Sequence, residues 1–178
     1  EKIFTTLLQE IKKEINRHTK RRKLLLYYYI SILYETGIRP VELRNLTWSH
    51  YQPNFGEGGL FNDVYSRKQN NKRCIALSPK IVKMLNRLKA RQKHFCELHG
   101  IDFKEEEINI ISICNSNNET NRYEIKAVKE FDNGFRRLLD RCHIAHTNSK
   151  VLYSYRHSYI SALVQNETPT INIVKQCG

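Results

Sequence analysis

Residues 24–43 read LLLYYYISILYETGIRPVEL, and this stretch decides the fold. Nearly every position from Leu24 to Glu35 is apolar or aromatic, which predicts a helix that is buried on most of its sides. Gly37 is expected to end that helix, because glycine commonly follows a helix C-terminus. Pro40 suits the first turn of a new short helix, with Glu42 close to its positive end. We therefore expect a central helix that turns directly into a second one.

The rest of the chain predicts further helices and one hairpin. Two strands, Leu60–Arg67 and Arg73–Leu77, are expected to pair across an asparagine-containing turn. Residues 108–113 predict either a buried strand or a short connector. Helical spacing of apolar residues predicts helices over residues 3–18, after Ser78-Pro79, along Ile125, Val128, Phe131, Phe135, Leu138 and Leu139, and over Ser154–Gln165 and Thr170–Cys177. These elements predict a mainly helical α+β domain with a small antiparallel β-sheet.

The charge balance indicates an anionic partner. The 178 residues include 30 Lys and Arg against 18 Asp and Glu, a formal net charge of +12. Duplex DNA is the first candidate, because basic proteins gain affinity by releasing its counterions. A membrane is not expected, because the longest apolar-rich run, Leu24–Leu33, is too short to span one and contains Ser31. The five cysteines are scattered and odd in number, which favours reduced thiols in a cytoplasmic protein.

Two sequence boxes carry a resemblance to a known family. TGIRPVEL at 36–43, followed by LTW at 46–48, resembles the T-G-x-R-x-x-E-L-x-x-L-x-W box of tyrosine recombinases, the phage integrases. YSYRHSY at 153–159 resembles their H-x-x-R-H-T box. Between the two boxes, KQNNKRCIAL at 68–77 resembles the family's K-T-G-K-x-R-x-V-P-L hairpin, and IVKQCG at 173–178 resembles the approach to its L-G-H motif. The resemblance covers the chain from about Leu24 onward.

The resemblance implies that residues 1–178 are the catalytic domain of a site-specific DNA recombinase. In this family a tyrosine attacks the scissile phosphate, and a 3′-phosphotyrosine intermediate preserves the bond energy for rejoining. None of the ten tyrosines aligns with that nucleophile, which is expected beyond Gly178, and a DNA-clamping domain is expected before Glu1. The implied activity integrates or excises a mobile element in a bacterial cytoplasm. The implied partners are duplex DNA and three further copies of the protein, and no cofactor or metal is implied.

The candidate catalytic residues are Arg39, Lys68, Tyr153 and Arg156. A phosphorane-like transition state gathers negative charge, and two rigid guanidiniums, Arg39 and Arg156, can hold its oxygens from two sides. The resemblance assigns Lys68 the role of general acid for the leaving 5′-oxygen, and Lys72 is its competitor on the same turn. Tyr153 replaces the family's usual histidine. Its phenol can donate a hydrogen bond to phosphate, but it is a poor base at neutral pH.

Two further residues are expected to support this set. Glu42 is interpreted as a partner that orients Arg39. His157 matches the family's second histidine, and the alternative is a hydrogen-bonded structural residue on a packed helix. The cationic candidates also have simpler interpretations, because Arg39 and Arg156 could be ordinary arginines and Lys68 the basic tip of a hairpin.

Three alternatives concern function. The clusters His94-x-Cys96-x-x-His99 and Cys142-His143-x-x-His146 mix zinc-capable ligands, but neither has the paired spacing of structural zinc modules. A DNA-binding regulator that kept this fold and lost cleavage is compatible with Tyr153. A type IB topoisomerase shares the chemistry, although the short box at 36–48 favours a recombinase. We expect Arg39 and Arg156 to converge on one basic face.

Overall fold

The computed structural model describes residues 5–10, 21–66, 70–117, 122–128, 130–144 and 152–177. This part of the chain is mainly helical with two small antiparallel sheets, which confirms the predicted α+β fold. Residues 5–10 are helical, and the remainder of the helix predicted over 3–18 lies outside the described residues. The helices are α2 (Arg21–Thr36), α3 (Pro40–Asn45), the 3-10 helix η1 (Trp48–His50), α4 (Pro79–Leu98), α5 (Asp132–Arg141), α6 (Ser154–Gln165) and α7 (Thr170–Cys177). The strands are β1 (Tyr51–Phe55), β2 (Gly58–Ser66), β3 (Asn71–Leu77), β4 (Ser112–Asn117) and β5 (Arg122–Ala127).

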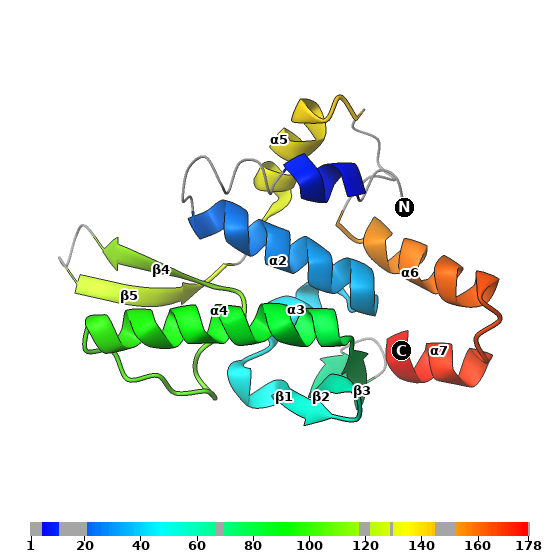
Figure 1. Ribbon diagram of the computed structural model, residues 1–178, viewed down its shortest axis with the longest axis horizontal. Coiled ribbons are helices and arrows are strands. Elements are labelled where there is room, and N and C mark those ends of the chain that lie inside the picture. The colour runs from blue at the N-terminus through cyan, green and yellow to red at the C-terminus, as the bar shows by residue number, and fades with distance from the viewer. Residues whose placement is uncertain are drawn as a thin grey trace.

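Helix α2 is the central element, as its sequence predicts. It runs through the middle of the molecule and contacts α4, α5, α6, β3 and β4 (Figure 1). Tyr29, Ile30, Ile32 and Leu33 are almost completely buried, so apolar side chains on most sides of the helix have a packing partner. No helix among the described residues is long and apolar enough to cross a bilayer.

Three sequence expectations about elements are wrong. Helix α2 begins at Arg21 rather than after Lys23, because Arg22 can stay exposed while the backbone continues the helix. Ile125 lies in β5 rather than in the predicted helix. It pairs there with Cys114 of β4, so the cross-strand partner overrides local spacing. Strand β1 is absent from the sequence prediction because it contains Pro53, which is tolerated since β1 is the edge strand of its sheet.

The predicted hairpin is confirmed, and it brings Ser66 of β2 and Arg73 of β3 close to the start of α3. Strands β2 and β3 are antiparallel, with Val64 opposite Arg73 and Ser66 opposite Asn71. The turn residues 67–69 lie outside the described residues, so Lys68 is not placed.

The helix predicted after Ser78-Pro79 is confirmed as α4. At its start the Ser78 hydroxyl accepts a hydrogen bond from the backbone N–H of Ile81.

A buried glutamine joins α4 to the segment that follows α3. The Trp48 indole N–H donates to Gln92 Oε1 at 2.7 Å. The Gln92 amide donates in turn to the carbonyls of Ile110 at 3.1 Å and Ser112 at 3.2 Å. Residues 108–111 form a connector and residues 112–113 already belong to β4, so the range 108–113 is divided between the two predicted alternatives. All these groups would be costly to bury without partners.

Gly37 sets the turn from α2 into α3. Its φ of +63° lies in the left-handed region, and its N–H closes α2 by donating to the Leu33 carbonyl at 3.0 Å. A Cβ at this position would lie 2.4 Å from Cδ1 of Tyr159 on α6. The absence of a side chain therefore lets α6 approach the α2–α3 turn.

We predict that Gly37→Ala destabilises the protein by about 3 kcal/mol, from a strained left-handed alanine plus the contact with Tyr159. Urea denaturation measures this value. In a Tyr159→Ala background the same substitution should cost only about 1 kcal/mol, the backbone strain alone. Equal costs in the two backgrounds would show that Gly37 does not limit the approach of α6.

Candidate active site

Arg39 lies at the point where α2 has ended and α3 begins. Its backbone is extended, with φ −68° and ψ 139°, which Pro40 favours in the residue before it. Its Nη1 donates to Glu42 Oε1 at 2.7 Å and to Ser66 Oγ at 2.9 Å. Its backbone N–H donates to Glu42 Oε2 at 3.1 Å. The side chain remains 14% exposed, so the guanidinium is held in place and still reaches the surface.

Glu42 is buried between two arginines. Its side chain is 3% exposed, and Arg73 of β3 donates to both of its oxygens, at 3.1 Å from Nη1 and 2.7 Å from Nη2. Burial alone raises the pKa of Glu42, but the hydrogen bonds from Arg73 and Arg39 outweigh burial, and the pKa is lowered. Glu42 is therefore a carboxylate that fixes the position of Arg39, in the place where the sequence suggested an orienting partner.

Arg156 lies on the first turn of α6 and is 5% exposed. Its Nη1 donates to the Gly37 carbonyl at 2.9 Å, and its Nη2 donates to the Cys177 carbonyl at 2.6 Å. Burial and then the nearby charge of Arg39 lower the pKa of Arg156. The hydrogen bond to Gly37 thus holds the second guanidinium beside the turn that carries Arg39.

Tyr153 lies beside Arg39 and is the residue immediately before α6. Its side chain is exposed, and its ring packs edge-on against His157, with centroids 5.2 Å apart. Burial acts to lower the pKa of Arg39, but the interactions with Glu42 and with the Tyr153 phenol outweigh it, and the pKa is raised. The phenol therefore contacts the same guanidinium that Glu42 holds, whereas the described contact of His157 is with Tyr153.

A hollow of about 500 Å³ lies beside Arg39 and Tyr153, between α3, β2 and the start of α6. Arg39 and Tyr153 line it, but Arg156 does not, because the ends of α2 and α7 enclose its guanidinium. The remaining lining residues are Val41, Glu42, Asn45, Leu46, His50, Asp63, Tyr65 and Ser66. The hollow is large enough for a phosphodiester and offers it cationic and hydroxyl donors.

Arg73 is a site residue to which the sequence analysis gave no role, although it occupies the arginine position of the K-T-G-K-x-R-x-V-P-L hairpin motif. It is 8% exposed, and its Nε also donates to the carbonyl of Gln176 on α7 at 3.3 Å. A signal was present, because Arg73, Ile75 and Leu77 alternate along β3 and so share one face of the strand. Since Ile75 and Leu77 point into the core, an arginine in that series required a buried anionic partner.

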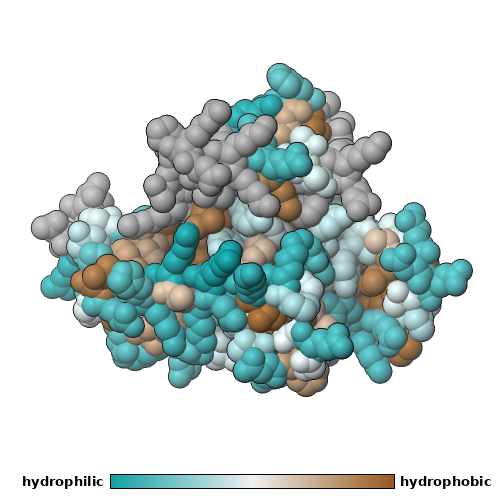
Figure 2. Space-filling model, viewed as in Figure 1, coloured by the Kyte–Doolittle hydropathy of each residue, from teal (hydrophilic) through white to brown (hydrophobic). Residues whose placement is uncertain are grey.

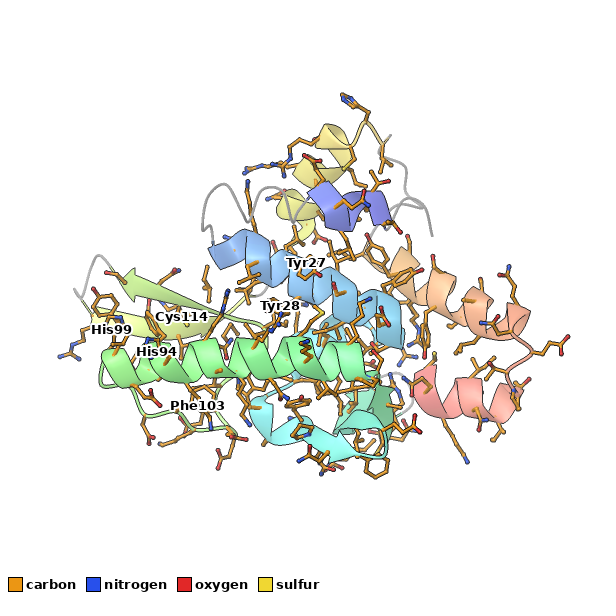
Figure 3. The ribbon with its side chains drawn as sticks, in the orientation of Figure 1. Tyr27, Tyr28, His94, His99, Phe103 and Cys114 are labelled. Atoms are coloured by element: carbon orange, nitrogen blue, oxygen red, sulfur yellow. The ribbon has the colours of Figure 1, made fainter. Side chains whose placement is uncertain are left out.

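The structure tests the zinc-capable clusters only in part. No group of three or more metal-ligating side chains gathers among the described residues, and His146 lies outside them. His99 stacks on Tyr123 of β5, with ring centroids 3.6 Å apart. Figure 3 shows His94 and His99 near the C-terminal end of α4, far along that helix from α3.

Comparison with known proteins identifies the family. The family model described as "Phage integrase family" matches residues 4–178. The chain belongs to the phage integrase family. No curated protein matches it significantly by sequence.

Solved structures of recombinases share the fold. XerA recombinase aligns over 100% of this chain and 54% of its own, with a TM-score of 0.67 and 18% identity. XerH site-specific recombinase, bound to a palindromic difH substrate after cleavage, aligns over 98% of this chain and 44% of its own, with a TM-score of 0.64 and 16% identity. This phage integrase family chain therefore spans about half the length of these recombinases.

We predict that Glu42→Gln lowers the free energy of unfolding by about 3 kcal/mol at pH 7, because two buried guanidiniums lose their counter-charge. The folded-state pKa of Glu42 is lowered from 4.5, so its contribution is complete above about pH 4.5 and is lost as the pH falls through the folded value. Urea denaturation of both proteins between pH 7 and pH 3 measures the difference. Exposed Glu106 provides the control, and Glu106→Gln should change stability little at either pH. A wild-type to Glu42→Gln difference that is independent of pH would contradict the pairing.

Proposed function

We propose that this chain is the catalytic domain of a tyrosine-type site-specific recombinase that cleaves and rejoins duplex DNA through a 3′-phosphotyrosine. The observation that carries the proposal is that Arg156 from the second box donates to the carbonyl of Gly37, two residues before Arg39 in the first box, at 2.9 Å. Membership of the phage integrase family supports it, and so does the similarity in fold to XerH in complex with its difH substrate. The net charge of +12 supports an anionic substrate.

Each residue has a role in the proposed reaction. Arg39 holds one nonbridging oxygen of the scissile phosphate, and Arg156 places a second positive charge behind it. Tyr153 donates a hydrogen bond to the same phosphate. Glu42 is a positioning residue that acts through Arg39, and Arg73 holds Glu42 in turn.

The proton and the nucleophile come from two further groups. Lys68 is proposed to protonate the leaving 5′-oxygen from the hairpin turn that joins β2 to β3. The hydroxyl of the nucleophilic tyrosine, which none of the ten tyrosines of this chain matches, attacks the phosphorus and releases its proton to solvent; the phosphotyrosine bond forms as the bond to the 5′-oxygen breaks. The reaction therefore needs this nucleophile, positioned cations and a proton donor. In the cell we propose that four copies carry it out on two DNA sites, to integrate or excise a mobile element.

The test is formation of a covalent protein–DNA adduct. The protein is expressed from its complete open reading frame, and its target duplex is selected by binding from a random pool. On a nicked form of that duplex in EDTA, the wild type should give an adduct on a denaturing gel. Arg39→Ala should lower its yield at least 100-fold, since one preorganised donor is worth about 3 kcal/mol in the transition state. Arg156→Ala should lower the yield as well, because it removes the second positive charge behind the phosphate.

The matched control is Arg136→Ala, because Arg136 is exposed on α5 and has no ion pair among the described residues. It should leave the adduct yield unchanged, and all three variants should still bind the duplex. A wild type that binds the selected duplex but forms no adduct would overturn the cleavage activity and identify a silent DNA-binding regulator.

We also predict that the Tyr153 phenol is replaceable by an imidazole but not by a plain ring. Tyr153→Phe should slow adduct formation about tenfold, the value of one hydrogen bond to a charged group. Tyr153→His should stay within about threefold of the wild type, because histidine retains a donor at this position. Single-turnover kinetics on the nicked duplex measure both rates, and a Phe variant as fast as the wild type would remove Tyr153 from the site.

A further inference from the structure

Helix α4 carries a row of positive charge outside the candidate active site. Lys83, Arg87 and Arg91 follow one another at intervals of four residues, so they form one stripe along the helix. All three are exposed, and none has an ion pair or side-chain hydrogen bond within the described part of the chain. We call these three residues the basic row.

The other three lysines of the same helix, which we call the flank lysines, already have acidic partners. Lys80 pairs with Glu35, and Lys89 at 2.7 Å and Lys93 at 3.7 Å share Glu105. The fold therefore supplies ion-pair partners to the flank lysines. Glu57 borders the same depression as Lys83 and Arg87, but no ion pair joins it to them within the described part of the chain. Like charges four residues apart weaken a helix, so the row carries a cost that an anionic partner would remove.

The basic row lies beside an open depression. Tyr28 of α2 lies between α2 and α4 (Figure 3), and Arg91 and Arg87 both act to lower its pKa against the larger effect of burial. Lys83 and Arg87 border an open depression of about 710 Å³ between α4 and the β1–β2 turn. Hydrophilic side chains form a band along α4 on the face shown in Figure 2. This depression shares no lining residue with the hollow beside Arg39.

We propose that the basic row is a second nucleic-acid contact, which binds the sugar–phosphate backbone of duplex DNA away from the candidate active site. The inference rests on the proposed function, because it assumes that the protein works on duplex DNA. Successive charges of the row lie about 6 Å apart along a straight helix and can meet a line of phosphates. An acidic protein is the less suitable partner, because interfaces between proteins are usually anchored by aromatic or apolar side chains. Between the charges the exposed face offers Asn86 and Ala90 instead.

The chain supplies a matched pair of variants for the test. Lys83→Gln/Arg87→Gln/Arg91→Gln removes the basic row, and Lys80→Gln/Lys89→Gln/Lys93→Gln removes the same number of charges from the ion-paired flanks. Both lower the net charge from +12 by three, and glutamine preserves helix propensity. Binding to a fluorescein-labelled 20-base-pair duplex of arbitrary sequence is measured by anisotropy between 50 and 200 mM KCl, with circular dichroism to check folding.

The salt dependence of binding gives the answer. Removing the basic row should reduce the slope of log affinity against log salt by about 2.7, so the affinity lost between 50 and 200 mM KCl becomes about 40-fold smaller. The flank triple should change the slope by less than about 1, because its lysines are already paired. The single variant Arg87→Gln should reduce the slope by about 0.9, which gives a second measurement with a smaller perturbation.

The failures of the two proposals are distinguishable. A wild type that binds duplex DNA with equal slopes for both triples would overturn the basic row and leave the proposed function intact. A labelled 20-residue polyglutamate is titrated in the same way as a model of an acidic protein. If Lys83→Gln/Arg87→Gln/Arg91→Gln loses affinity for the polyglutamate but not for the duplex, DNA is overturned as the partner in favour of an acidic protein. A wild type with no affinity for any duplex would overturn the proposed function itself.

Discussion

The arrangement of the candidate site depends on the ion pairs that the Glu42 carboxylate forms with Arg39 and Arg73. A buried charge is tolerated only when it is paired and hydrogen-bonded, and Glu42 has Arg39 on one side and Arg73 on the other. Arg39 belongs to the turn before α3, and Arg73 belongs to β3. The same carboxylate therefore fixes the direction of the Arg39 guanidinium and attaches the α2–α3 turn to the sheet.

A second constraint brings Arg156 to the same place. Gly37 has no side chain, so α6 can approach the end of α2, and the Arg156 guanidinium then donates to the Gly37 and Cys177 carbonyls. Arg156 thus joins the end of α2 to the end of α7. The Gln176 side chain reinforces that position by bonding both backbone groups of Ala76 on β3. The arginine pair is consequently set by packing between elements that are distant in sequence.

Much of this arrangement could be predicted from the sequence because local rules agree with it. The apolar run from Leu24, the Gly37 stop and Pro40 each specify their own element, and the two boxes single out Arg39 and Arg156. What could not be predicted depends on contacts between distant segments. Ile125 satisfies helical spacing, and only pairing with β4 makes it part of a strand. Arg73 fills the arginine position of the hairpin motif, but its buried pairing with Glu42 of α3 depends on how β3 packs against that helix.

The most direct test of the arginine pair as the phosphate site is ¹⁵Nε NMR of the arginine side chains during titration with a short duplex, with signals assigned by Arg39→Lys, Arg73→Lys and Arg156→Lys. We expect the Arg39 signal to shift most as a phosphodiester enters the hollow, because Arg39 lines it, and the Arg156 signal to shift less, because its guanidinium is enclosed behind it. The Arg73 signal should stay in place, because Arg73 does not line the hollow and both of its terminal nitrogens donate to Glu42. A shift of Arg73 with Arg39 and Arg156 unchanged would contradict this assignment, since the phosphate would then be bound elsewhere.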